Sequence, residues 1–211
     1  MRVSVLSSAE FEPITVAQAK DYCRVTHTLE DTIIADLITS ARELCEQASR
    51  VPISLQKFRA AFRWPKVESI YGLAAHLDDP DSIAKGIRIP RNPVVAVDEV
   101  RLVAEDGTSK VLDLAQKEYR VQGERIFIAV DENYTTGYQE VVITFDAGWP
   151  SNADSVGEGE EPVTECPALL TQCVKDTVAH LYRNRGDEAA SLPRKVRNML
   201  QAFAETGGYV G

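Results

Sequence analysis

The chain has 211 residues, of which 44% are hydrophobic and 26% charged, and its formal net charge is −9. This composition is that of an ordinary globular protein that can bury a full core in one or two domains, and it lacks the long apolar run that a membrane-spanning helix needs. The acidic balance argues against a protein that grips nucleic acid, because such binding depends on clustered lysines and arginines.

Residues 1–13 look extended and irregular, and two helical patterns follow them. Thr15 is placed as the N-cap of a short helix, and Gln18 at the third helical position completes a capping box. A second helix begins at Glu30 or Asp31 and runs to about Arg50, because apolar residues recur there at three- and four-residue steps. Its predicted buried stripe consists of Ile33, Ile34, Leu37, Ile38, Ala41, Leu44, Cys45 and Ala48.

From about residue 53 to 148 the pattern changes to the two-residue period of β-strands. Residues 55–63 alternate between basic and aromatic or small side chains, which predicts a strand with an aromatic face. Residues 64–86 are rich in proline, glycine and aspartate and fit neither period, so they are predicted to be a long insertion. Asp106–Gly107 predicts a hairpin turn, and Gly123–Glu124 separates two more short strands.

An acidic loop is predicted at residues 151–165. This stretch contains five acids and no base, so its local net charge is −5. A run of like charges with glycines is typical of a flexible, solvated segment. The acids are Asp154, Glu158, Glu160, Glu161 and Glu165.

The strongest helical pattern covers residues 167–185. Pro167 suits the first turn of a helix, and Gly186 lies where a helix stop belongs. The apolar stripe is too wide for a helix on a free surface, so we expect it to pack on the helix of residues 30–50. The stripe consists of Leu170, Cys173, Val174, Thr177, Val178, Leu181 and Tyr182.

The C-terminal residues 189–211 form a further helix and a small glycine-rich tail. They carry three bases and one acid, a net charge of +2 that differs in sign from the rest of the chain. We interpret this segment as an arm that docks on another protein, so that deleting residues 192–211 would leave the rest folded; the competing interpretation is that the helix packs on its own domain. The candidate partner-binding residues are Arg194, Lys195, Arg197, Leu200, Phe203 and Tyr209.

The order of elements predicts an α+β fold. Helices from the two ends of the sequence, at about 15–50 and 167–185, would form a helical bundle, with a small β-rich sheet or barrel from about 53–148 inserted between them. We therefore expect one domain over residues 1–188 and a separate C-terminal helix or arm over 189–211.

No catalytic motif is present, and we expect neither enzyme activity nor a cofactor or metal. His76 lies near Asp78, Asp79 and Asp81, a group that could hold a divalent cation, so a carboxylate or metal hydrolase remains an alternative. The four cysteines, Cys23, Cys45, Cys166 and Cys173, form no CxxC pair. They are interpreted as reduced core thiols, with a disulfide or a metal site as the alternatives.

Three stretches, in order, carry a resemblance to a known family. The first contains Ile14-Thr15, Ala19-Lys20, Arg24-Val25, His27, Asp31 and Ala41-Arg42 before Glu46; the second is IRIPRNPVVAVDEVRLVAEDG; the third joins VVITFDAGWP to ECPALLTQCVKDTVAHLYRNR. Together they resemble the head–tail connector proteins (head completion or adaptor proteins) of long-tailed phages and gene transfer agents. The chain departs from that family in its longer 64–86 insertion and in having Arg50-Val51 where Gly-Arg is common.

The resemblance implies a structural virion protein at the head–tail junction, made in the cytoplasm of the host bacterium. Such a protein forms a cyclic ring of identical subunits, about twelve by family habit. The ring lies under the portal protein, extends the DNA channel and joins the DNA-filled head to the stopper or tail protein. Double-stranded DNA passes through without sequence-specific binding, so we expect an acidic or neutral lumen; no membrane is involved. A monomeric tail-completion or tail-terminator factor is the alternative.

Overall fold

The computed structural model describes residues 1–63, 86–129, 137–155, 157, 161–185 and 191–205. The chain folds into two compact units. Residues 1–8 and 56–147 form the first, which we call the β unit, and residues 9–55 and 148–211 form the second, the helical unit. The predicted α+β class is confirmed. The units do not follow the expected division into residues 1–188 and 189–211, because the C-terminal helix belongs to the helical unit.

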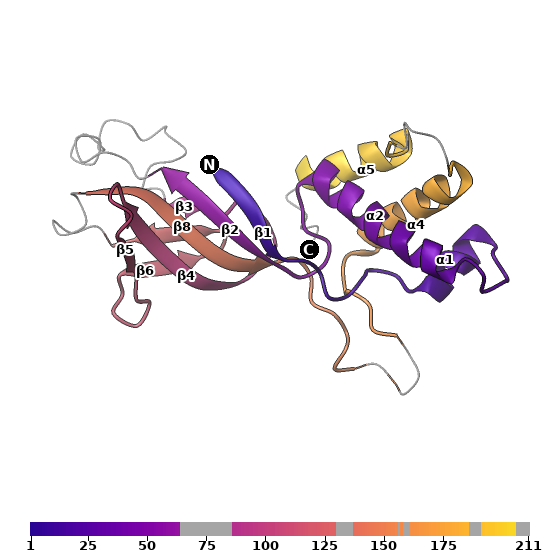
Figure 1. The fold of residues 1–211 in the computed structure, drawn as a ribbon, viewed down its shortest axis with the longest axis horizontal. Coiled ribbons are helices and arrows are strands. Elements are labelled where there is room, and N and C mark those ends of the chain that lie inside the picture. Colours follow the sequence, from indigo (N-terminus) through magenta and orange to yellow (C-terminus); the bar gives the residue numbers. More distant parts are fainter. Residues whose placement is uncertain (64–85, 130–136, 156, 158–160, 186–190, 206–211) are drawn as a thin grey trace. The chain divides into compact units, whose positions relative to one another are not determined.

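The β unit contains two antiparallel sheets (Figure 1). The five-stranded sheet has the order β1-β2-β8-β4-β5, and the three-stranded sheet has the order β3-β7-β6. The strands are β1 (Arg2–Ser7), β2 (Gln56–Arg63), β3 (Ile87–Arg88), β4 (Val94–Ala104), β5 (Ser109–Val111), β6 (Tyr119–Gln122), β7 (Arg125–Ile128) and β8 (Tyr138–Ala147). The predicted turns at Asp106–Gly107 and Gly123–Glu124 are confirmed, since they join β4 to β5 and β6 to β7.

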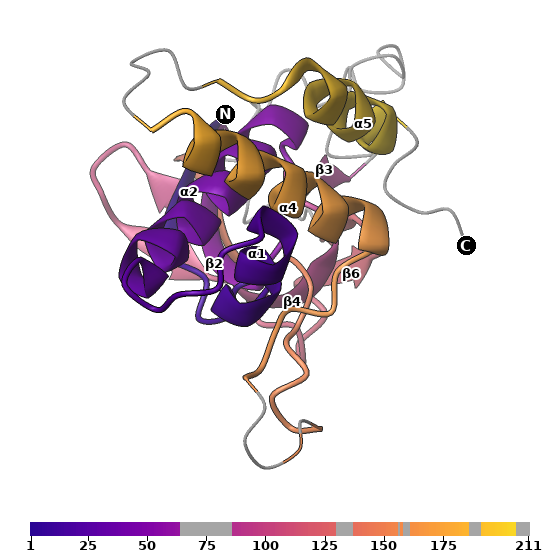
Figure 2. The same ribbon diagram turned by 90° about the vertical axis from the view of Figure 1, so that its right-hand side faces the viewer.

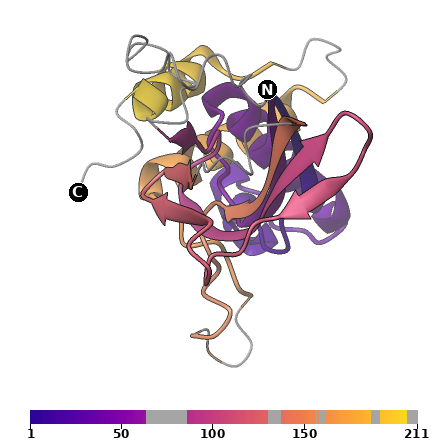
Figure 3. The same ribbon diagram turned by 90° about the vertical axis from the view of Figure 1, so that its left-hand side faces the viewer.

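One apolar core is shared by the two sheets of the β unit, whose strands are seen from another side in Figure 3. Phe58 of β2 stacks on Phe145 of β8 with ring centroids 5.7 Å apart, and Ile126 of β7 is fully buried in the same cluster. Because side chains alternate across a strand, the residues between the buried ones on β2, β8 and β4 lie on the opposite, outer face of the five-stranded sheet. This outer face carries several charged side chains and is described below.

In its described residues, the helical unit has four helices that pack around one core (Figure 2). They are α1 (Val16–Cys23), α2 (Asp31–Ser49), α4 (Ala168–Arg183) and α5 (Arg194–Glu205). The predicted capping box of α1 is confirmed: the backbone N–H of Gln18 donates to Thr15 Oγ1 at 3.1 Å, and Gln18 Oε1 accepts from the backbone N–H of Thr15 at 3.4 Å. The predicted packing of the second helix on the long helix is also confirmed, since α2 and α4 share this core.

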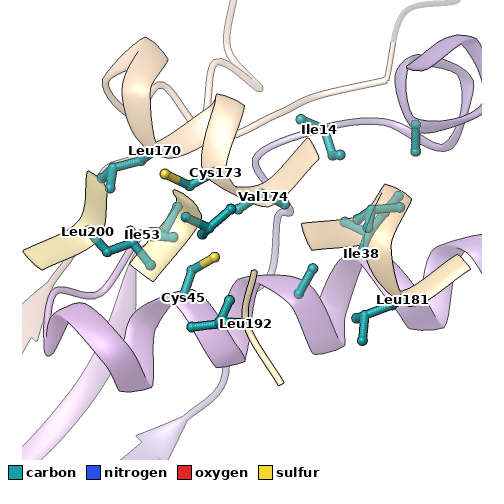
Figure 4. Close-up of a cluster of buried hydrophobic side chains, with 14 of the residues drawn as sticks. Ile14, Ile38, Cys45, Ile53, Leu170, Cys173, Val174, Leu181, Leu192 and Leu200 are labelled. Carbon is teal, nitrogen blue, oxygen red and sulfur yellow. The ribbon is translucent and has the colours of Figure 1, made fainter. Parts of the chain in front are cut away.

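Figure 4 shows the centre of this core, where side chains of α2, α4 and the C-terminal region meet. Cys45 of α2 and Cys173 of α4 are both fully buried and free, and Cys45 Sγ lies 3.6 Å from Thr177 Oγ1. Burial raises the pKa of the Cys45 thiol to about 11 and that of Cys173 to about 12. These two thiols act as small apolar core groups, because a raised pKa keeps them in the unreactive protonated form.

A buried arginine ties the start of the helical unit to α2. Arg42 is only 3% exposed, and it donates from Nε to Glu12 Oε2 and from Nη1 to Glu46 Oε2, both at 2.9 Å. Glu46 uses its other oxygen to accept the backbone N–H of Ile53 at 2.7 Å. A charge buried in this way must be paired, and its partners fix the two chain segments that flank α2.

The predicted acidic loop begins and ends in an ordered stem. Ser151 and Thr164 form an antiparallel bridge, and the backbone N–H of Asn152 donates to the carbonyl of Val163 at 3.0 Å. Thr164 is buried and donates a side-chain hydrogen bond to the carbonyl of Phe11 at 3.1 Å. We call Ser151–Glu165 the acidic hairpin; its residues 156 and 158–160, like the 64–85 part of the predicted insertion, lie outside the described residues.

Candidate partner-binding site

The apolar side of α5 is buried within the helical unit. Val196 and Leu200 have no exposed surface, and Leu192, just before the helix, is also buried. Phe203 is partly buried, with its ring 6.4 Å from that of Trp149. The apolar stripe that we expected to be offered to a partner is therefore used by the chain itself. A stripe at helical spacing shows that a helix needs a partner surface, but it does not show whose surface that is.

The basic side of α5 faces solvent. Arg194, Lys195 and Arg197 are all exposed. Arg194 and Arg197 are three residues apart and so lie next to each other on the helix surface. Among the described residues neither of these two arginines forms an ion pair, whereas Lys195 Nζ lies 3.0 Å from Asp176 Oδ2 of α4.

Lys195 belongs to a polar network that joins three helices. Asp176 accepts hydrogen bonds from Tyr22 of α1, from Gln172 of α4 and from Lys195 of α5. Burial alone would raise the pKa of Asp176, but these hydrogen bonds outweigh it and lower the pKa below its usual value. The same bond to Asp176 raises the pKa of Lys195. Lys195 therefore fastens α5 to its own unit.

Of the six candidate partner-binding residues, Arg194 and Arg197 lie next to each other on the exposed side of α5, and Lys195 is also exposed but is bound to Asp176. Leu200 lies in the core and presents nothing to a partner, and Phe203 is half-buried beside it. Tyr209 lies outside the described residues. The partner-binding role of the exposed residues stays a prediction.

A second charged surface, on the outer face of the five-stranded sheet, was not predicted. A hollow of about 700 Å³ lies there, and its lining includes Arg2, Arg59 and Arg101. Arg63 lines the adjoining hollow. The alternation of basic residues along β2 was a signal for this surface, but the neighbouring strands that complete it are distant in sequence.

The possible cation site at His76, Asp78, Asp79 and Asp81 lies outside the described residues. Within the described ranges, no group of three or more histidine, cysteine or acidic side chains is placed to hold a metal ion. None of the helices in the described part of the chain is long and apolar enough to cross a membrane.

Comparison with known proteins gives matches at the level of structure. No family model matches the sequence, and no curated protein matches it. A chain in the neck of an empty gene transfer agent particle, computed with C6 symmetry, is similar with a TM-score of 0.63 and 19% identity, over 96% of this chain and 95% of that one. A chain in the virion of a native gene transfer agent particle has a TM-score of 0.62 and 20% identity, over 96% and 94%.

A third similar chain comes from the neck of a native gene transfer agent particle computed with C12 symmetry. Its TM-score is 0.60 at 18% identity, and the match covers 96% of this chain and 94% of that one. At this low identity the likeness establishes a shared fold. The match covers nearly the whole of each chain, so both the sheets and the helices have counterparts in those proteins.

Proposed function

We propose that this chain is a structural component of the neck of a gene transfer agent or tailed-phage particle. The observation that carries the proposal is the fold that the chain shares, over nearly its whole length, with chains of gene transfer agent necks. The ordered sequence resemblance to head–tail connector proteins points to the same place in a particle. In this role the protein is an adaptor between the DNA-filled head and the tail, and it performs no catalysis.

The adaptor works as a cyclic ring of identical subunits, about twelve in number, that continues the DNA channel below the portal. The necks that contain the similar chains were computed with sixfold and twelvefold symmetry, which supports a ring. A ring of this kind needs two different complementary surfaces on each subunit. The net charge of −9 suits a channel that lets DNA slide through without holding it.

The exposed basic side of α5 is the surface we assign to the portal or stopper protein. Arg194 and Arg197 are fixed in place because the apolar side of their helix is buried and Lys195 is bound to Asp176. Reversing both charges, as Arg194→Glu with Arg197→Glu, should leave the fold intact and reduce attachment of the chain to portal-bearing heads. Asn198→Ala, an exposed change on the same helix, is the matched control. Normal attachment of the double variant would remove this surface from the proposal.

Deleting the gene from a producing strain tests the adaptor role. We expect DNA-filled or leaking heads and free tails in electron micrographs, because the joint between them is missing. Complementation with the intact gene should restore complete particles. Complete, infectious or transducing particles without this chain would contradict an adaptor role, and normal necks bearing abnormal tail ends would indicate a tail-completion factor instead.

A further inference from the structure

Four arginines gather on the outer face of the five-stranded sheet, and we call this surface the arginine face. The strand register places them in neighbouring rows. Arg2 on β1 lies opposite Ala61, Ala61 opposite Val142, and Val142 opposite Arg101 on β4, so that two arginines belong to one row. Val111 of β5 continues this row beyond Arg101. Arg59 and Arg63 on β2 belong to the rows on either side. Strands about 4.8 Å apart therefore bring four guanidinium groups onto one surface.

The positive charge of this face is only partly neutralised within the chain. Arg2 pairs with Glu140 at 2.9 Å, although the arginine side chain is 83% exposed. Arg101 forms a two-pronged pair with Glu99, at 2.9 and 2.8 Å. Arg59 and Arg63 are exposed, and no described residue forms an ion pair with either of them. The hollow between these side chains leaves room for a carboxylate-bearing segment.

The acidic hairpin of the same chain carries the opposite charge. Asp154, Glu161 and Glu165 are exposed, and in the described part of the chain none of them forms an ion pair. The paired stem and the buried Thr164 hold both ends of the hairpin on the helical unit. The described stem of the hairpin is thus anchored to the helical unit and carries exposed carboxylates without ion-pair partners in the described part of the chain, and the other unit exposes arginines in the same condition.

We propose that the acidic hairpin of one copy of this chain binds the arginine face of a second copy. The inference rests on the proposed ring, and it names the two surfaces that would meet in it. They are different surfaces on different units, so their contact is head-to-tail, which is the type of contact that closes a ring. Guanidinium groups bind carboxylates in two-pronged pairs, which fixes the register of the contact as well as its strength.

Binding of a labelled hairpin peptide tests the contact whether or not the free chain assembles. A fluorescent peptide of residues 151–165 is titrated with the full chain, and anisotropy reports binding. We expect saturable binding that weakens about tenfold or more with Arg59→Glu and Arg63→Glu together, and that weakens strongly as salt is raised. Arg88→Glu, an exposed change on the other sheet, should have no effect. No binding by the intact chain, or equal binding by the arginine-face variant, would overturn the proposal.

A mixing experiment then shows whether the contact is between copies. One variant has the reversed arginine face, Arg59→Glu with Arg63→Glu. The other has the reversed hairpin, Asp154→Lys with Glu161→Lys and Glu165→Lys, which changes the net charge of the hairpin from −5 to +1. Each alone repels itself, but in an alternating assembly every hairpin meets a face of opposite charge. We expect native mass spectrometry to show mixed assemblies of the two variants and only monomers of each alone. Monomers in the mixture would overturn the proposal in favour of a contact within one chain.

A competition experiment with duplex DNA completes the test. If the arginine face binds a 20-base-pair duplex more tightly than the peptide, its partner is nucleic acid and the proposal fails. The outcome for the ring itself is decided separately, by imaging the neck of the particle. If imaging of the neck shows a ring but the peptide and mixing experiments are negative, the contact between the hairpin and the arginine face is wrong and the proposed function still holds.

Discussion

Shortening Leu200 to alanine tests whether α5 is part of the helical core or an arm. Leu200 has no exposed surface, and it lies in a cluster with residues of α2 and α4. Removing three buried carbons from a close-packed site costs the lost transfer energy and a cavity term, which together come to about 3 kcal/mol for a leucine at such a position. The cost should appear in full, because side chains on three helices surround the site and cannot collapse into it.

Chemical denaturation with two probes measures this cost. Circular dichroism follows the helices, and in a Trp64→Phe background the fluorescence of Trp149, which lies beside Phe203, follows the site itself. The exposed change Asn198→Ala on the same helix should alter the free energy of unfolding by less than about 0.5 kcal/mol. If Leu200→Ala costs no more than that control, α5 does not pack as described, and the arm interpretation, with its dispensable residues 192–211, is restored.

Three further changes probe the contacts that shape the helical unit. Gly148 has φ of +112°, and an added Cβ would lie 2.2 Å from the carbonyl oxygen of Ser54, so Gly148→Ala should lower the midpoint of thermal unfolding by several degrees or prevent folding, which calorimetry will show. Arg42→Ala leaves two carboxylates without their shared partner and should cost about 3 kcal/mol in a urea titration. Asp176→Asn should cost about 1.5 kcal/mol at pH 6. Because the folded-state pKa of Asp176 is lowered, its contribution is complete above the ordinary carboxyl pKa near 4 and is lost as the pH falls below it, so the deficit should shrink in acid.

The helices could be predicted because their signals are local. The capping box at Thr15 and Gln18 involves residues three apart, and the stripes of α2 and α4 repeat within each helix. Because the apolar stripes of α2 and α4 both had to be buried, we could predict that the two helices pack together. Most strands of the β unit were found in the same way, from alternation and from glycine-containing turns.

Features that depend on distant residues could not be predicted. The first strand was missed because residues 1–8 have a weak pattern of their own and are held by pairing with β2. The burial of Leu200 depends on the presence of α2 and α4, which its own helix does not reveal. The sequence predicts that Arg42 is a solvent-facing charge on α2. It is buried because Glu12, thirty residues earlier in the chain, lies beside it and accepts its hydrogen bond. The arginine face likewise combines β1, β2 and β4, which come from separate parts of the chain.

Electron cryo-microscopy of the neck of particles that contain this chain is the most direct test of its function. The proposed function predicts a closed ring of identical subunits around the DNA channel at the head–tail junction, with density that fits both the β unit and the helical unit. Quantitative mass spectrometry of the same particles should give about twelve copies for each portal ring. A single copy at the neck, or a neck without this chain, would contradict the account.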